Sequence, residues 1–396
     1  MSLERRYQNV EDFAEAARRR LPRIFADYID GGSFSETTLR RNREDFDRYA
    51  LRQRVLAPLE ASSDLSVTVA DRSSRLPFGP GPVGFLGLYR RNGDIAVAQA
   101  AAKAGIPFVL STFSINGLGT VRKATDVAPD FQLYLDEDPE VNAAHLESCR
   151  AEGVERIFLT VDTAITSVRE RDVRNGFRSV DRMTPGLLWQ FAQRPAWSLD
   201  ILRGGFPEVE LVRGRPEFGR GAMAQAGNLS RRLDKNLTWE TVARLRKEWS
   251  GQLFIKGIAY PADAARAREA GVDGIVLSNH GGRQLDHGRS TVALIQEVRE
   301  ALGPSPALFV DSGFRRGSDI VKALALGADF VLMGRPFAWA VAAEGEAGVA
   351  HLITLLEREI EITLNLMGLS SIEALRREGP STLLKTPSVL ADGALR

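Results

Sequence analysis

The sequence predicts an α/β fold: a (β/α)8 TIM barrel with an N-terminal helical extension and a long insertion after its fourth strand. Three observations support this. Alanine-rich helical segments, a glycine and a short apolar strand recur in that order. The candidate strands number eight, the count that closes such a barrel. Polar and ionisable residues stand at consecutive strand ends, where barrel enzymes carry their active sites. A doubly wound open sheet is the alternative.

Composition and charge narrow the class of protein. Of 396 residues, 44% are hydrophobic and 26% charged, as in globular chains. The net charge of +1 gives no field that favours nucleic acid. One cysteine, Cys149, and four histidines offer little for a disulfide or a metal site. Because the start lacks an apolar signal segment and no stretch of about 20 residues is apolar throughout, we expect a cytoplasmic enzyme.

The repeated unit is the clearest pattern. Each copy places a glycine between helix and strand, where a helix end favours the left-handed conformation. A buried run rich in β-branched residues follows, as expected for a parallel strand covered on both faces. The four copies are residues 96–112, 144–162, 264–280 and 319–335, with Gly105, Gly153, Gly271 and Gly327.

The predicted strands, in order, are about 77–84, 107–111, 131–135, 156–161, 253–257, 274–278, 307–311 and 330–334. Helical patterns such as 261–269 and 290–301 separate most of them. Three prolines make the first strand the weakest prediction. We interpret residues 1–396 as one domain, with the barrel proper at about 77–345.

Two segments lie outside the repeat. Residues 1–75 begin with an amphipathic helix, with Asn9 as N-cap and an apolar face of Val10, Phe13, Ala16 and Ala17, and continue as irregular polar sequence. Residues 179–236, called the excursion below, are rich in Arg, Gly and Pro. A connection this long suits a lid, an oligomer contact or an element that touches a membrane, or else a surface excursion with its own small core.

The densest motif follows the sixth strand, at residues 278–286 (SNHGGRQLD). His280 can exchange a proton near neutral pH, and the glycines after it allow the backbone to approach a ligand closely. Arg283 has a planar fork that suits a carboxylate. The structural alternative is a core histidine beside a tight turn.

Other strand ends supply further candidates. Asp162, after the fourth strand, can orient His280 if the barrel brings them together, or else cap a helix. Arg169 can provide a second cation for an anionic substrate. Lys256 ends the fifth strand, where a Schiff base or stabilisation of negative charge on a cofactor ring is open to it. Tyr134 and Tyr28 can donate hydrogen bonds to substrate or belong to the core.

The loops after strands seven and eight predict a phosphate site. Glycines there expose main-chain amides and arginines add charge, as in many barrel enzymes. A phosphorylated substrate and a phosphate-bearing cofactor both remain open, and neither dinucleotide nor P-loop motif is present. The residues are Asp311, Gly313, Arg315, Gly334 and Arg335.

The motifs 278–286 and 315–329 (RRGSDIVKALALGAD) resemble the FMN-dependent 2-hydroxy acid dehydrogenase/oxidase family. The resemblance extends from Tyr28 to about residue 370. Segments 104–112 (AGIPFVLST), 194–200 (RPAWSLD) and 311–319 (DSGFRRGSD) are most similar to its bacterial (S)-mandelate dehydrogenase type.

The resemblance implies roles at the substrate. His280 would be the base, with Asp162 stabilising its charged form. Arg283 and Tyr28 would hold the substrate carboxylate, assisted by Arg169. Tyr134 would hydrogen-bond the hydroxyl that becomes a carbonyl.

The resemblance also implies FMN as cofactor. Lys256 would lie at the flavin N1–O2 edge, which excludes a Schiff base, and Asp311 would bind the ribityl chain. Gly313, Arg315, Gly334 and Arg335 would take the phosphate. The remaining flavin contacts would be Val83, Gly84, Ser111, Gln132, Thr160 and Ser278. Many relatives have threonine where this chain has Val83, so one flavin hydrogen bond is expected to be missing.

Substrate size and partners follow less directly. Gly84 stands where glycolate oxidase, a member of the family, has alanine, as in the mandelate dehydrogenases. An aromatic substrate such as (S)-mandelate is favoured by Gly84, by Phe113 and by the neighbourhood of Gly117 and Gly119. Aliphatic acids of the lactate or glycolate type are the alternative. The acceptor of electrons would be quinone, another carrier or oxygen.

The family further implies a homotetramer and peripheral membrane contact through residues 179–236. The competing classes are another FMN barrel, such as an isopentenyl-diphosphate isomerase or a nucleotide dehydrogenase, and a silent flavin-binding barrel. The first would need loops for a substrate phosphate.

Overall fold

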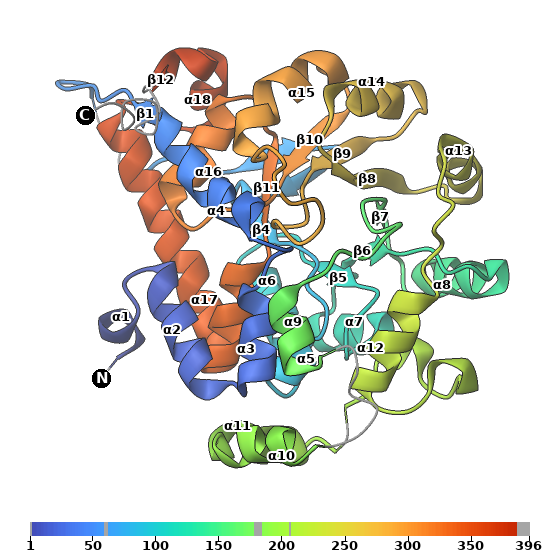
Figure 1. The fold of residues 1–396 in the computed structure, drawn as a ribbon. Helices are drawn as coiled ribbons and strands as arrows, with labels where there is room; N and C mark the ends of the chain where they lie inside the picture. The colour runs from blue at the N-terminus through green and yellow to red at the C-terminus, as the bar shows by residue number, and fades with distance from the viewer. Residues whose placement is uncertain (1, 59–61, 178–183, 206, 386–396) are drawn as a thin grey trace, which may run out of the picture.

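The computed structural model describes residues 2–58, 62–177, 184–205 and 207–385. Eight parallel strands form a nearly closed barrel surrounded by helices, which confirms the predicted (β/α)8 fold (Figure 1). The strands are β4 (Phe78–Pro80), β5 (Val109–Ser111), β6 (Asp130–Leu133), β7 (Arg156–Thr160), β8 (Gln252–Ile258), β9 (Gly274–Leu277), β10 (Ala307–Val310) and β11 (Phe330–Met333).

Every predicted strand is present, within a few residues of its expected ends. Their hydrogen-bonded order is β4-β11-β10-β9-β8-β7-β6-β5, with β4 and β5 at the two ends. Just beyond these two strands, the Phe85 amide donates to the Phe113 carbonyl at 3.0 Å and joins the edges. The proline-rich first strand differs most from its prediction: of residues 77–84, only Phe78–Pro80 form a strand. Proline has no N–H to donate to a strand ladder.

Helices cover the outside of the barrel. Those that follow strands are α6 (Gly93–Lys103), α7 (Leu118–Thr125), α8 (Pro139–Ala151), α13 (Trp239–Glu248), α14 (Pro261–Glu269), α15 (Ile295–Leu302), α16 (Gly317–Ala325) and α17 (Arg335–Leu366). The glycines predicted to end helices do so, with φ of 66° at Gly105, 69° at Gly153, 71° at Gly271 and 113° at Gly327.

The N-terminal extension contains more structure than the sequence suggested. Helix α2 (Val10–Arg20) has the predicted Asn9 cap and packs against α17, with Ala14 rather than Ala16 on its buried face. The supposedly irregular part holds α3 (Arg23–Asp30), α4 (Thr37–Glu44), η1 (Asp45–Arg48), β1 (Tyr49–Leu51) and the hairpin β2 (Val67–Val69) and β3 (Arg72–Ser74). The short remaining elements are α1 (Leu3–Arg6), α5 (Leu86–Tyr89), η4 (Val292–Leu294), α18 (Ile372–Glu378), η5 (Gly379–Thr382) and β12 (Leu383–Lys385).

The barrel interior is aromatic, and one of its ends is plugged. Phe254 and Phe309 lie 4.9 Å apart between ring centroids, and the buried Arg156 lies over both rings. Arg156 also donates to the carbonyl of Val69 in the β2–β3 hairpin, which covers the amino ends of the strands. The open end is therefore the one formed by the carboxyl ends.

The excursion between β7 and β8 is mostly helical. Its residues 179–183 and 206 lie outside the described part, as does residue 178, between it and α9 (Glu170–Asn175). Its elements are α10 (Pro185–Ala192), α11 (Pro195–Leu202), η2 (Glu210–Val212), η3 (Pro216–Phe218) and α12 (Ala222–Arg231). Helices α10 and α11 lie at the periphery, away from the barrel (Figure 1). Within the described residues, no helix is both long and apolar enough to cross a bilayer.

Candidate active site

The carboxyl ends of the strands enclose a cavity of about 1340 Å³, including the space open to solvent. The predicted site residues that line it are Tyr28, Val83, Gly84, Ser111, Gln132, Tyr134, Thr160, Arg169, Lys256, His280, Arg283, Asp311, Gly313, Arg315, Gly334 and Arg335. The two others, Asp162 and Ser278, lie just behind it and bond to lining residues. The structure thus brings the strand-end residues together.

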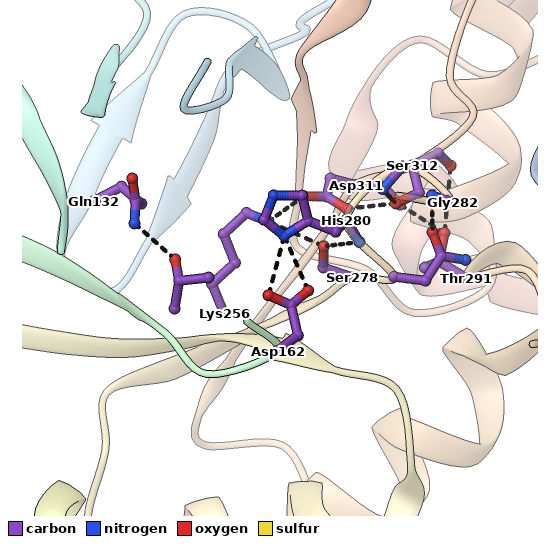
Figure 2. Close-up of polar contacts among 12 residues, drawn as sticks. Gln132, Asp162, Lys256, Ser278, His280, Gly282, Thr291, Asp311 and Ser312 are labelled. Carbon is purple, nitrogen blue, oxygen red and sulfur yellow. Dashed lines mark hydrogen bonds and ion pairs between the residues drawn. The ribbon is translucent and has the colours of Figure 1, made fainter. Parts of the chain in front are cut away.

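His280 and Asp162 form the pair that the sequence left open. His280 Nδ1 lies 3.0 Å from Oδ1 and 3.2 Å from Oδ2 of Asp162 (Figure 2). Burial alone would raise the pKa of Asp162, but the charge and hydrogen bond of His280 and the nearby Lys256 together hold it below its usual value. An ionised Asp162 accepts a hydrogen bond from Nδ1 and fixes the ring, so that the lone pair of the other ring nitrogen can accept a substrate proton.

The backbone around His280 is held in an unusual conformation. His280 has φ +58°, a left-handed value that non-glycine residues seldom adopt. The amide of His280 donates to Ser278 Oγ at 3.1 Å, and the Gly281 amide donates to Ser312 Oγ at 3.0 Å. Such strain is typical of residues that must present a side chain at a set angle.

Lys256 is a buried cation between two acidic groups. Its Nζ lies 3.1 Å from Asp311 Oδ2 and donates to Ser278 Oγ at 3.0 Å (Figure 2). Burial lowers the pKa of the ammonium, but Asp311 and Asp162 outweigh that effect and raise it. A lysine held in its charged form is a poor nucleophile and a good partner for negative charge on a ring.

Two arginines and a tyrosine form one wall. The guanidinium carbons of Arg283 and Arg169 lie 4.6 Å and 5.4 Å from the centroid of the Tyr28 ring. Arg283 also donates to the carbonyls of Tyr28 and Gly31. Burial, and then the charge of Arg169, lowers the pKa of Arg283. The two guanidinium groups repel each other, and a substrate carboxylate bound to both would offset that repulsion.

Tyr134 also lines the cavity, with its ring 5.2 Å from that of Phe113. Burial, and then the Asp162 carboxylate, raises the pKa of its phenol above the usual value. The hydroxyl therefore keeps its proton and can donate it to a substrate oxygen.

Neighbouring strand ends form a polar ledge. Ser111 Oγ donates to Gln132 Oε1 and Gln132 Nε2 donates to Thr160 Oγ1, both at 3.0 Å. This chain fixes the amide of Gln132, whose donors and acceptors suit the polar edge of a flat heterocycle.

The predicted phosphate site holds the buried Arg315 and the half-buried Arg335. Burial is the main reason why the pKa of Arg335 falls to about 9, and burial and nearby arginines lower that of Arg315. Arg335 donates to the carbonyls of Ile29, Gly281 and Gly31, each at 2.8 or 2.9 Å. Each of its two terminal nitrogens keeps a further N–H that could donate to a phosphate. The phosphate role of Arg335 itself stays a prediction.

Sequence reasoning missed several lining residues. Ser230 and Leu233 reach the cavity from the excursion, and Tyr89 reaches it from α5. Gln284 was inside the quoted motif, and its amide donates to the carbonyls of Asp162 and Ile165. Only Gln284 had a signal that could have been used, because the others do not stand at strand ends.

One prediction about pocket size was wrong. Gly117 and Gly119 do not line the cavity. A Cβ on Gly117 would lie 3.1 Å from Glu210 Cδ, and one on Gly119 would lie 2.8 Å from Glu152 Oε1. These glycines make room for glutamates of neighbouring elements rather than for a substrate. The described residues contain no group of His, Cys, Asp and Glu suited to a metal ion.

Comparison with known proteins places the chain. Residues 17–381 match the family of FMN-dependent dehydrogenases. The L-lactate dehydrogenase of Pseudomonas paraeruginosa is 40% identical over 365 residues, which cover 91% of this chain and 94% of that protein. The enzyme of the same name from Caulobacter vibrioides is 39% identical over 369 residues, covering 93% of this chain and 96% of that protein.

Solved structures agree. That of a monotopic membrane protein, (S)-mandelate dehydrogenase, superposes with a TM-score of 0.90 at 36% identity, covering 96% of this chain and all of that one. Mandelate oxidase with (S)-4-hydroxymandelic acid gives a TM-score of 0.81 at 33% identity, covering 94% and 98%.

The residues of the cavity fit FMN. Lys256 offers charge to an anionic ring edge, the Gln132 ledge offers hydrogen bonds, and the buried Arg315 and half-buried Arg335 suit a phosphate. The His280–Asp162 pair beside two arginines suits removal of a proton from a hydroxy acid. The chain therefore belongs to the FMN-dependent dehydrogenase family and is an FMN-dependent 2-hydroxy acid oxidoreductase.

Proposed function

We propose that this enzyme oxidises an (S)-2-hydroxy acid with an aromatic side chain, such as mandelate, to the 2-oxo acid. The observation that supports an aromatic substrate is the wall formed by Gly84 and Phe113. A Cβ on residue 84 would lie only 2.8 Å from Phe113 Cβ, so glycine is what lets Phe113 approach this closely and form part of the cavity wall. Phe85, Phe113, Tyr28 and Tyr134 also line the cavity.

Each polar group has a task in this reaction. Arg283 and Arg169 bind the carboxylate and orient the substrate. Tyr134 donates to the oxygen that becomes the carbonyl. His280 takes the hydroxyl proton, or the α-proton in the carbanion version, and Asp162 stabilises the resulting imidazolium. FMN, when bound, accepts the two electrons that leave the substrate.

A lactate-type aliphatic acid is the second candidate. It is favoured by the relatives named L-lactate dehydrogenase, at 40% identity over nearly the whole chain. The aromatic substrate is favoured by the solved mandelate enzymes, whose identity to the chain is slightly lower.

We also propose a quinone, another carrier or oxygen as acceptor, a homotetramer, and peripheral membrane contact through the excursion. Helices α10 and α11 support the membrane contact. Trp197 anchors them, with Nε1 donating to the Leu88 carbonyl at 2.8 Å, while four large apolar side chains face solvent. They are Leu188, Trp189, Leu199 and Leu202, exposed by 52, 65, 56 and 67%. A face of this kind beside Arg194 and Arg203 suits an interface with anionic lipid.

The test of function is the visible spectrum of the purified protein without oxygen, before and after adding (S)-mandelate or (S)-lactate. Bleaching of the flavin by (S)-mandelate is the expected result. Bleaching by (S)-lactate alone would move the assignment to the second candidate, and bleaching by neither would reject both. Mixing the reduced enzyme with air or with a quinone then identifies the acceptor.

A further inference from the structure

Glu210, in the excursion, binds the loop that follows β5. Its Oε2 accepts from the Gly117 amide at 2.8 Å, and its Oε1 accepts from Thr120 Oγ1 at 2.7 Å. Its own amide donates to the Ile115 carbonyl at 3.2 Å. One residue of the excursion thus makes three contacts with a barrel loop and with the first turn of α7.

These contacts supply a helix cap from outside the helix. Gly117 is the N-cap residue of α7 and has no side chain with which to cap it. The first amides of a helix need acceptors, and a carboxylate there is also favoured by the helix dipole. The small size of Gly117 is what admits Glu210, because a Cβ would lie 3.1 Å from its Cδ and 3.2 Å from its Cγ.

A second carboxylate holds the same loop from the other side. Asp94, in the first turn of α6, is buried, and its Oδ2 accepts from the amides of Ile115 and Asn116, both at 3.2 Å. Asp94 and Glu210 therefore bind three consecutive amides, those of residues 115 to 117. Since both carboxylates come from other elements, the position of the loop depends on where those elements lie.

The same loop carries a wall of the substrate cavity. Phe113 precedes the tethered residues by two positions, lines the cavity and packs its Cβ against Gly84. Its carbonyl accepts from the Phe85 amide at 3.0 Å. A shift of residues 115–117 would thus be passed to the ring that faces the substrate side chain.

We propose that Glu210 is a positioning residue for substrate selection: through the β5–α7 loop it holds Phe113 against Gly84 and sets the size of side chain that the cavity accepts. The excursion then has a role in specificity that is separate from any contact with a membrane. The proposal rests on the proposed function in that it needs a 2-hydroxy acid whose side chain meets Phe113.

The test compares Glu210→Ala with Gly117→Ala, which crowds the same carboxylate from the other side, and with the double variant. The readout is kcat and KM for (S)-mandelate and (S)-lactate on the FMN-loaded enzyme. Each single variant should change the ratio of the two kcat/KM values by about tenfold, mainly through KM, as expected for altered fit of a side chain. The double variant should change this ratio by no more than Glu210→Ala does, because both substitutions act on the same contact.

Glu217→Ala is the matched control, since Glu217 is an exposed glutamate of the same excursion. It should leave both constants unchanged. Glu210→Gln, which keeps a hydrogen-bond acceptor, should have a ratio of the two kcat/KM values between that of Glu210→Ala and that of the parent. A merely structural Glu210 would lower the yield of active enzyme but not the ratio, and an unchanged ratio in both single variants would overturn the proposal.

Hydrogen–deuterium exchange separates this proposal from the proposed function. Peptides covering residues 112–125 should exchange faster in Glu210→Ala than in the parent or in Glu217→Ala, whether or not either acid reduces the flavin. If neither acid does so while exchange rises, the proposed substrate fails and the tether stands. If exchange in this loop is unchanged, the tether itself is refuted.

Discussion

Nδ1 of His280 lies 3.0 Å from Oδ1 of Asp162, although 118 residues separate them in the chain. Because this contact occupies one ring nitrogen, the other is left to exchange a proton with substrate. The carboxylate fixes the orientation of the ring.

Removing either member of this pair should stop chemistry while FMN stays bound. We expect His280→Ala and Asp162→Asn to lower the rate of flavin reduction by about 10²- to 10⁴-fold, the usual contribution of a positioned base. Rapid mixing with substrate under anaerobic conditions measures the rate, and the flavin absorbance of the purified variant checks that FMN is retained. Near-normal reduction in His280→Ala would show that another group is the base.

Gly84→Ala should penalise a large substrate more than a small one. The new Cβ would meet Phe113 Cβ at 2.8 Å, which forces the ring or the loop to move. We expect kcat/KM for (S)-mandelate to fall about tenfold relative to that for (S)-lactate. Gly186→Ala is the control, because a Cβ there meets nothing within 4 Å. Equal effects on both acids would place the substrate side chain elsewhere.

Lys256→Met should destabilise the protein and slow flavin reduction. The change keeps the length of the side chain but leaves Asp311 without its ion-pair partner at 3.1 Å. Breaking a buried pair costs about 3 kcal/mol in free energy of unfolding. Urea denaturation measures this cost, and Lys103→Met, which removes a largely exposed lysine, serves as control. If both variants unfold alike, Lys256 and Asp311 do not stabilise the fold as a pair.

Asp94 should make stability depend on pH in a direction opposite to most carboxylates. Burial raises its pKa from 3.8 to about 6, so the folded state favours the protonated form. Its contribution to stability is full below pH 3.8, and is lost as the pH rises from there through 6. The free energy of unfolding of the parent minus that of Asp94→Asn should therefore increase, by up to about 3 kcal/mol, as the pH falls from 7 to 4.

Unfolding curves of both proteins across this pH range give that difference directly. Subtracting the variant removes the effect of other carboxylates such as Asp286, whose pKa hydrogen bonds hold at about 2 against the effect of burial. A difference that is flat with pH would mean that Asp94 titrates normally.

The exposed face of α10 and α11 should bind anionic vesicles. Replacing Leu188 and Trp189 by serine should reduce co-sedimentation with such vesicles by about tenfold, because apolar burial drives interfacial binding. Activity with a water-soluble acceptor should be unchanged. Leu56→Ser removes an even more exposed apolar side chain elsewhere and should have no effect. Vesicle binding that survives the double change would assign the contact to another surface.

Much of the site could be predicted because short stretches of sequence determine where each strand ends. Each strand shows as an apolar run, and helix-ending glycines such as Gly105 and Gly327 mark where the next strand begins. Once eight parallel strands are assumed, their carboxyl ends must meet, so Lys256, His280 and Asp311 were expected at one place. Arg283 then indicated an anionic substrate, and Arg315 and Arg335, with the glycines beside them, indicated a phosphate.

Only the tertiary structure decided what lies between those strand ends and the excursion. Ser230 and Leu233 line the cavity from a connection with no strand pattern, and Glu210 fills the space beside Gly117 that the sequence had assigned to substrate. Periodicity reports which face of an element is buried, but not which distant element covers it. Local sequence thus determined the barrel and the polar groups at its strand ends, whereas contacts between segments far apart in the chain determined the shape of the pocket.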